Sequence, residues 1–186
     1  AYALKTESEN NTDDDYAGRI GAQWRDDFWE IGASHMRSGE EFNPEAGFVP
    51  REGVHKTAGQ FGITQRPRGS IPWVREFNPQ VEVEYITNTE NLLETRTMEA
   101  DFSTEFNDAS FFRIGYERTF ERLEEDFEIR DGINIPMGDY SWDEFSFFYR
   151  SDSSRKLSGS ASVSSGGFWG GDRTRYRGGI QFQPNY

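Results

Sequence analysis

The sequence contains no cysteine and only two histidines. Disulfides and thiolate metal sites are therefore excluded. It also has no run of about 18 apolar residues, so we expect no transmembrane helix. This absence does not argue against a membrane barrel, because the signal of a single spanning strand is weak. Basic residues are scarce too: 20 Lys and Arg against 33 Asp and Glu give a net charge of -13. That balance disfavours nucleic acid as a partner, since phosphates are bound by clustered Lys and Arg.

Hydrophobic residues make up only 34% of the chain, yet aromatic residues make up 16%, including 16 Phe. Low hydrophobicity combined with high net charge is typical of disordered chains, but such chains are poor in aromatic residues. A sheet with one aromatic face and one charged face would produce both properties. The composition therefore favours a folded β-protein.

Alternation of apolar and polar residues is the main pattern of the sequence. Val81, Val83 and Tyr85 alternate with Glu82 and Glu84, which is the two-residue period of a β-strand. Similar alternation recurs in about ten segments, most of them about 9 to 13 residues long, and no segment has a convincing helical period. We predict an all-β, antiparallel fold in which residues 1–186 form part of a single β-barrel domain.

Alternation alone does not distinguish a soluble sheet with one wet face from an outer-membrane barrel. The strand length favours the barrel, because globular strands usually have about 5 to 6 residues and tilted membrane strands about 9 to 11. Short turns at 26–27, 107–110 and 152–154 alternate with longer loops, of which 124–140 is the longest and 166–172 is rich in glycine. This alternation is expected of barrels with one periplasmic end, although 67–79 is long where a short turn is due. Aromatic residues near the predicted strand ends, where a bilayer interface favours them, are Tyr16, Trp24, Trp29, Tyr85, Tyr149 and Tyr176.

The period also assigns side chains to the two faces of the predicted transmembrane barrel. The charged side chains that we expect to face the lumen are Glu82, Glu84, Glu99, Asp101, Glu105, Arg113, Glu117, Arg150, Arg175 and Arg177. The side chains that we expect to face lipid are Trp24, Trp29, Val83, Tyr85, Phe102, Ile114, Tyr116, Phe145, Phe147, Tyr149, Ile180 and Phe182.

The segment 40–51 interrupts the alternation. Its two prolines and its glycine forbid regular helix or ladder structure. Its two phenylalanines are too apolar for an ordinary solvent loop, so we expect other residues to pack on them. We predict an ordered loop between two long strands, with the motif residues Asn43, Pro44, Gly47, Phe48, Pro50 and Arg51.

Several segments resemble an uncharacterised bacterial family of outer-membrane proteins. They are the loop at 43–51 and the segments 116–123, 138–140, 151–159 and 166–173. Members of that family pair an N-terminal domain similar to carbohydrate-binding module family 9 with a C-terminal outer-membrane β-barrel. The resemblance covers nearly the whole chain from Tyr16 onward, and the loop motif is its most specific part.

The resemblance implies the barrel fold, an outer-membrane location and an association with carbohydrate. It supplies no catalytic residues, because none is established for the family. The chain departs from the family pattern in two ways: the carbohydrate-binding-like domain is absent, and the family's barrel continues beyond residue 186. The chain therefore resembles an internal portion of that barrel, and we expect further strands.

Candidate chemical sites all have simpler interpretations. Paired carboxylates could serve a glycosidase, but on strands their spacing is the alternation itself. His35 and His55 flank the loop and could approach each other across a hairpin, with Glu40 or Glu41 as a third metal ligand. We favour the view that both histidines are polar residues at a barrel rim.

Residues in the predicted loops also have both a functional and a simpler interpretation. The aspartates at 13–15 could hold calcium but match no spaced calcium loop. The glycines of 166–171 lack the following helix and lysine of a phosphate-binding loop. Trp73, Trp142 and Trp169 could stack on sugars, anchor the chain at an interface or pack within loops.

We therefore expect a non-enzymatic barrel in the bacterial outer membrane, with a charged lumen that serves passage or surface handling of a polar solute such as a carbohydrate. The partners expected are outer-membrane lipid, that solute and other membrane or periplasmic chains, with no nucleic acid, no metal and no cofactor. Alternatives are a structural or interaction barrel plugged by its own loops or by a partner, and a soluble antiparallel sheet that acts as a binding module. A carbohydrate-active enzyme is the least favoured.

Overall fold

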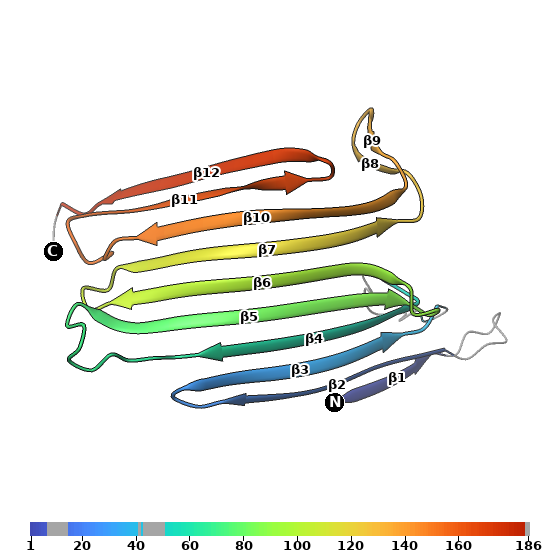
Figure 1. Ribbon diagram of the computed structural model, residues 1–186, viewed down its shortest axis with the longest axis horizontal. Helices are drawn as coiled ribbons and strands as arrows, with labels where there is room; N and C mark the ends of the chain where they lie inside the picture. The colour runs from blue at the N-terminus through green and yellow to red at the C-terminus, as the bar shows by residue number, and fades with distance from the viewer. Residues whose placement is uncertain (7–14, 41, 43–50, 185–186) are drawn as a thin grey trace.

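The computed structural model describes residues 1–6, 15–40, 42 and 51–184. Ten strands form one antiparallel sheet in which each strand pairs with the next along the chain (Figure 1). The prediction of an all-β, antiparallel fold is confirmed. In this sheet the outermost strands are the first and the last. The strands are β1 (Tyr2–Thr6), β2 (Asp15–Arg25), β3 (Trp29–Ser38), β4 (Val54–Ile63), β5 (Val74–Asn88), β6 (Leu93–Phe106), β7 (Phe111–Leu123), β10 (Gly138–Arg150), β11 (Leu157–Phe168) and β12 (Gly171–Phe182).

The connection between β7 and β10 is not the irregular loop that the sequence predicts. It contains a separate hairpin of β8 (Phe127–Arg130) and β9 (Ile133–Ile135), which stands apart from the main sheet in Figure 1. Two other predicted loops are too long. β5 begins at Val74, inside the predicted connection 67–79, and the predicted glycine-rich loop 166–172 shrinks to a turn at Trp169 and Gly170. Glycine and proline led to these errors, because both are usually loop residues.

Strand length sets this sheet apart from an ordinary globular one. From β2 to β7 and from β10 to β12 every strand has 10 to 15 residues. Strands in globular proteins usually have about 5 or 6. The sheet is therefore long enough along its strands for the two ends to lie in different surroundings.

Pro79 lies inside β5, where proline is unusual because it cannot donate a backbone hydrogen bond. The ladder between β4 and β5 ends at the pair Gly62 and Gln80. Pairing resumes only at an isolated bridge, where the amide of Gln65 donates to the carbonyl of Phe77 over 2.8 Å. Pro79 falls between these two points, so its missing donor coincides with an interruption of the ladder.

Aspartates close the short turns at one end of the sheet. In the β2–β3 turn, Asp26 accepts hydrogen bonds from the amides of Phe28 and Trp29, each over 2.7 Å. In the β6–β7 turn, Asp108 accepts a bond of 3.0 Å from the amide of Ser110. Asp side chains stabilise turns by such bonds to amides that follow them in the chain. The short turns predicted from the sequence are therefore formed by local chemistry.

The β10–β11 turn gives a pH-dependent prediction. The amide and the hydroxyl of Ser154 donate to Asp152, over 2.8 and 2.7 Å, and lower the pKa of its carboxyl group below the usual 3.8. A carboxylate with a lowered pKa stabilises the fold fully above its usual pKa and loses that contribution as the pH falls through the lowered value. We expect hydrogen-exchange protection of the Ser154 amide to fall below about pH 4.

The control for this prediction is Asp152→Asn, which keeps an acceptor oxygen at the same place but cannot titrate. Protection in that variant should no longer depend on pH beyond the intrinsic exchange rate. An unchanged pH dependence in the Asn variant would show that another group controls the turn.

The sheet has almost no interior. Its accessible surface is 13105 Å², whereas a folded monomer of this mass exposes about 9,200 Å². Large hydrophobic side chains are exposed along all the long strands, including Trp24 at 64% and Phe145 at 63%. The fold is therefore a single layer with two open faces rather than a layered core. Among the residues that the structure describes, the buried hydrophobic ones are Phe42, Val54, Val74, Ile86 and Ile135.

Candidate functional site

The strand register separates the side chains onto two chemically distinct faces. Successive residues of a strand point to opposite sides, and directly paired residues on neighbouring strands point to the same side. Following the pairs from β2 to β12 places all ten charged residues predicted to face a lumen on one side, the polar face. All twelve residues predicted to face lipid lie on the other side, the apolar face. Which medium each face contacts stays a prediction.

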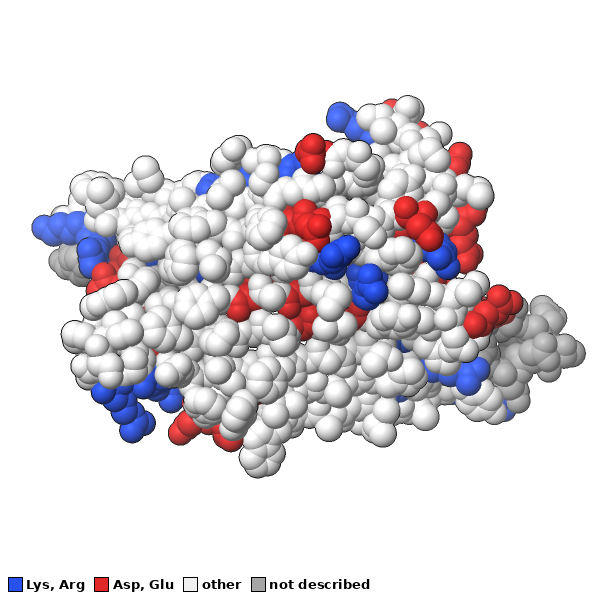
Figure 2. Space-filling view, in the orientation of Figure 1, with Lys and Arg blue, Asp and Glu red and all other residues white. Residues whose placement is uncertain are grey.

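Figure 2 shows one side of the molecule, on which uncharged atoms cover most of the strands. Charged atoms lie right of centre, toward the end of the sheet at which β7 runs into the β8–β9 hairpin in Figure 1, and also around the left-hand end of the view. On the apolar face the charged residues of β7 and β10 lie at that end: Arg118 is 3.8 Å from Asp143, and Arg122 is held by Asp139 at 2.7 Å. On β7 and β10 the apolar face is thus apolar over most of its length and charged near the end that leads to the hairpin.

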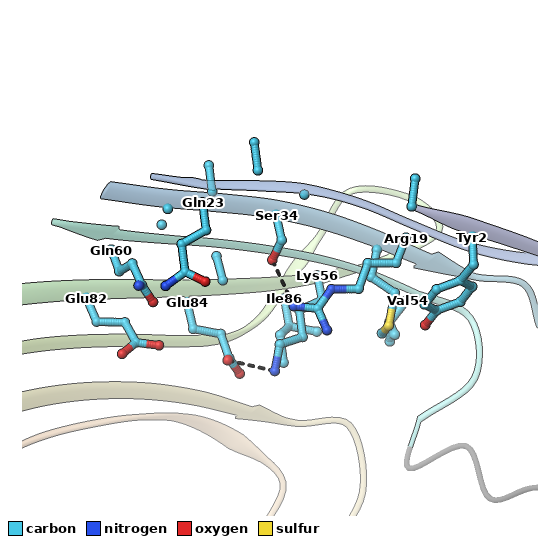
Figure 3. A pocket seen from close by; sticks show the side chains of 18 of the residues that line it. Tyr2, Arg19, Gln23, Ser34, Val54, Lys56, Gln60, Glu82, Glu84 and Ile86 are labelled. Atoms are coloured by element: carbon cyan, nitrogen blue, oxygen red, sulfur yellow. Dashed lines mark hydrogen bonds and ion pairs between the residues drawn. The ribbon is translucent and has the colours of Figure 1, made fainter. Parts of the chain in front are cut away.

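A hollow of about 830 Å³ lies against the polar face over β2 to β5. Figure 3 shows the side chains of Gln23, Gln60 and Glu82 pointing into it from three different strands. Lys56 and Glu84, which also line the hollow, form an ion pair of 2.6 Å. The lining is mixed: small and aliphatic residues such as Val54 and Ile86 lie beside these charged and amide side chains, which could bind the polar groups of a solute.

Four glutamates form one row across the polar face. Glu82, Glu99, Glu117 and Glu144 lie on β5, β6, β7 and β10, each directly paired with the next. Like charges directly opposite each other destabilise a sheet, so this row needs counter-charges. Arg173 supplies one at the far end, where its guanidinium lies 3.0 Å from Glu144.

Arg113 supplies the central counter-charge. Its guanidinium donates to Glu99 over 2.8 Å and to both oxygens of Asp101 over 2.7 Å. Gly115 makes room for this contact, since a Cβ there would lie 2.5 Å from Asp101 Oδ1. Glu82 has no ion pair or hydrogen bond with any residue that the structure describes. The row is therefore partly neutralised and keeps an excess of negative charge.

Removing the central counter-charge should be costly. We expect Arg113→Gln to lower the free energy of unfolding by about 1–2 kcal/mol, between the values for exposed ion pairs and for charge-assisted bonds. Guanidinium unfolding of the detergent-refolded protein would measure it. Adding Glu99→Gln should recover part of the loss, because one of the two repelling carboxylates is gone. Equal effects of Glu99→Gln with and without Arg113 would show that the two side chains are not coupled.

Basic residues gather on the last strand. Arg173, Arg175 and Arg177 share the polar face of β12. On the described chain, the exposed Arg175 and Arg177 have no ion pair. The polar face is therefore divided, with acidic residues in the middle strands and basic residues at the β12 edge.

Arg51 is the one residue of the predicted loop motif that the structure describes; Asn43, Pro44, Gly47, Phe48 and Pro50 lie outside it. Its guanidinium donates to Thr95 on β6 and to Glu121 on β7, each over 2.8 Å. Arg51 also lines the hollow. The end of the β3–β4 connection thus reaches across the polar face to strands that are not its neighbours.

The tryptophans considered for sugar stacking pack on other aromatic rings. Trp142 and Trp169 have ring centroids 5.1 Å apart, and Tyr140 lies 5.3 Å from Trp169. Trp73 stacks on Phe106 at 5.7 Å. Trp169 stands at the β11–β12 turn, so its contacts fit the interpretation as loop packing, whereas Trp142 lies within β10. The aromatic cluster at this turn was not foreseen, although the adjacent Phe168 and Trp169 were an available signal.

In the described part of the chain the remaining candidates do not come together as a metal site. His35 and His55 do approach each other, with ring centroids 5.8 Å apart, and His35 Nδ1 lies 2.9 Å from the hydroxyl of Thr57. Within the described ranges no three His, Asp or Glu side chains are grouped as metal ligands. Glu41 and the aspartates 13–14 lie outside those ranges, and the glycines of 166–167 belong to β11.

Comparison of the chain with protein-family models, with curated proteins and with solved structures finds no match. Among the described residues no helix is long and apolar enough to cross a membrane.

Proposed function

We propose that the chain is part of a β-barrel in the outer membrane of a bacterial cell, of the family that the sequence resembles. In this proposal the apolar face contacts lipid and the polar face lines the lumen. The barrel is not an enzyme, and it serves passage or surface handling of a polar solute. The carbohydrate nature of that solute comes from the resemblance alone.

The observation that carries the proposal is the continuous exposure of the apolar face. A soluble sheet of this size would have to cover aromatic and aliphatic side chains on the nine long strands, and isolated layers of this kind are rare because apolar faces must be buried. Hydrocarbon covers such a face without any further protein. The strand lengths of 10 to 15 residues are also sufficient, since a tilted strand crosses a bilayer with about 9 to 11.

The two edges of the sheet place a condition on the proposal. β1 and β12 each have one side without a partner strand in the described sheet. An unpaired backbone group in hydrocarbon costs several kcal/mol, so an open edge is not tolerated there. Further strands must therefore close the barrel between β12 and β1, in agreement with the longer barrel of the family that the sequence resembles.

The divided charge of the polar face supports passage of a polar solute. A row of acidic residues opposite basic ones creates a field across a lumen, which orients dipolar solutes and slows apolar ones. Counter-charges such as Arg113 are held by hydrogen bonds in fixed positions. The lining is thus pre-organised, and it needs no nucleophile or general base.

The test is fractionation of the full-length protein in a Gram-negative host, with a carbonate wash and heat-modifiable gel mobility. Recovery in the membrane pellet together with a heat-induced mobility shift is the expected result. Recovery in the soluble fraction without detergent would overturn the proposal and favour the soluble binding module.

A plugged barrel is the second candidate, and Arg51 favours it. Its bonds to Thr95 and Glu121 tie the β3–β4 connection across the polar face. Planar-bilayer conductance separates the two candidates. An open pore conducts in the wild type, whereas a plug predicts conductance only after Arg51→Ala.

A further inference from the structure

A groove of about 680 Å³ lies on the apolar face. Small side chains form its floor, because Val81 and Ala100 are paired in register, and larger rings form its sides. Tyr116 is paired with Ala100 on one side of the floor, and Phe61 is paired with Val81 on the other. A channel with a narrow apolar floor and aromatic walls fits a hydrocarbon chain.

The groove is free of uncompensated charge along its length. Asp101 also borders it, but that residue belongs to the polar face and its carboxylate is bound by Arg113. The interrupted ladder at Pro79 borders the groove as well. A backbone gap and small residues together explain why the apolar face is hollowed here.

Two arginines stand beyond one end of the groove on the same face. Arg118 follows Tyr116 by two residues on β7, which is about 7 Å along a strand. Arg96 is paired with Phe120 on the neighbouring β6, so the two arginines are diagonal neighbours on the apolar face. The groove therefore has an apolar body, and Arg96 and Arg118 form a basic end to it, with Asp143 beside Arg118.

The two arginines differ in whether a carboxylate lies close enough to neutralise their charge. Arg118 lies 3.8 Å from Asp143, which also accepts a hydrogen bond of 2.6 Å from Tyr116. Arg96 has no carboxylate within 4.0 Å in the part of the chain that the structure describes, and its guanidinium lies over the ring of Phe120 at 6.0 Å. Arg96 faces outward, has no carboxylate partner and lies next to an apolar groove. This combination suits a ligand that carries an anionic group on a hydrocarbon chain.

We propose that this groove binds an anionic phospholipid, with an acyl chain along Ala100 and Tyr116 and the phosphate group against Arg96 and Arg118. This inference rests on the proposed function, because it places the apolar face in a bilayer. A lipid held in this way would fix the depth of β6 and β7 relative to the headgroups, since the basic end marks the level of the phosphates.

The test is native mass spectrometry of the full-length detergent-solubilised protein, with dioleoylphosphatidylglycerol or dioleoylphosphatidylcholine added at equal concentration. We expect one retained phosphatidylglycerol and several-fold weaker retention of phosphatidylcholine. Inorganic phosphate in excess should not displace the lipid, because it offers no acyl chain to the groove.

Two kinds of variant separate the charge from the groove. Arg96→Gln and Arg118→Gln should each weaken phosphatidylglycerol retention about fivefold and leave phosphatidylcholine unchanged. Ala100→Leu fills the floor and should weaken both lipids. The matched controls are Arg37→Gln and Ala161→Leu, which make the same changes on the apolar face of β3 and β11, away from the groove.

Equal retention of the two lipids, unaffected by both arginine variants, would overturn the lipid site. Equal effects of Arg37→Gln and Arg96→Gln would also overturn it, since they would reflect the overall charge of the face. These outcomes are distinct from failure of the membrane assignment, which would show itself as a protein recovered without detergent.

Discussion

Replacing Phe147 by arginine is expected to cost about 2–4 kcal/mol of folding free energy in a lipid bilayer. Phe147 lies on the apolar face of β10, directly paired with Ile114 on β7 and Val163 on β11. Its ring also packs against Phe112 at 5.3 Å. The nearest residues of the same face along the strand are aromatic as well, so a guanidinium group there would have no polar partner and would be placed in hydrocarbon.

The matched control is Ser146→Arg, the same substitution one residue earlier on the same strand. Ser146 faces the opposite way, and it is paired with Gly115 beside the carboxylate of Asp101. We expect this variant, like Glu82→Ala, to change stability by less than about 1 kcal/mol. The measurement is guanidinium-induced unfolding of the protein in thin bilayers. Equal costs for Phe147→Arg and Ser146→Arg would contradict the assignment of the apolar face to lipid.

The second large effect is expected for Gly166→Ala, which should destabilise the fold by about 3 kcal/mol, at the upper end of the range for overpacked sites. A Cβ at Gly166 would collide with the carbonyl oxygen of Asp143 and lie 2.5 Å from the Cα of Glu144. Both are backbone atoms of β10, which cannot move without breaking the ladder. Arg173 also depends on the glycine, because its ion pair with Glu144 crosses the strand at this position.

Gly178→Ala is the control for this prediction. Its Cβ would be 3.8 Å from the nearest backbone atom, the carbonyl oxygen of Ser160, which is an ordinary contact. The heat-modifiable fraction of refolded protein, followed over temperature, would report both variants. A Gly166→Ala variant as stable as Gly178→Ala would show that β10 and β11 can separate locally without loss of the sheet.

The sequence predicted those features of the fold that depend on neighbouring residues. The alternation of Val81, Glu82, Val83 and Glu84 is a property of a single strand, so it divides side chains between two faces without knowledge of any partner. The short turns were predictable for the same reason, since Asp152 bonds to an amide two residues away. That the faces contact lumen and lipid stays a prediction, because it concerns what surrounds the sheet.

Features that depend on distant residues could not be predicted. Gly166 and Gly167 indicate a loop by composition, but the structure uses them inside β11, where β10 approaches too closely for a side chain. The hairpin of β8 and β9 was missed because its strands have only four and three residues. The contacts of Arg51 with Thr95 and Glu121 join residues 44 and 70 positions apart, and no local pattern marks them.

The order of the strands has a consequence for how the chain folds. Because each strand of the main sheet pairs with its predecessor and its successor, every pairing joins neighbouring segments of the chain, and no pairing has to wait for strands from distant parts of the sequence to meet. The sheet of such a chain can form by adding one hairpin at a time, and the topology slows folding little. The bonds of Arg51 to β6 and β7 require a much longer loop to close, and we expect them to form only after those hairpins are in place.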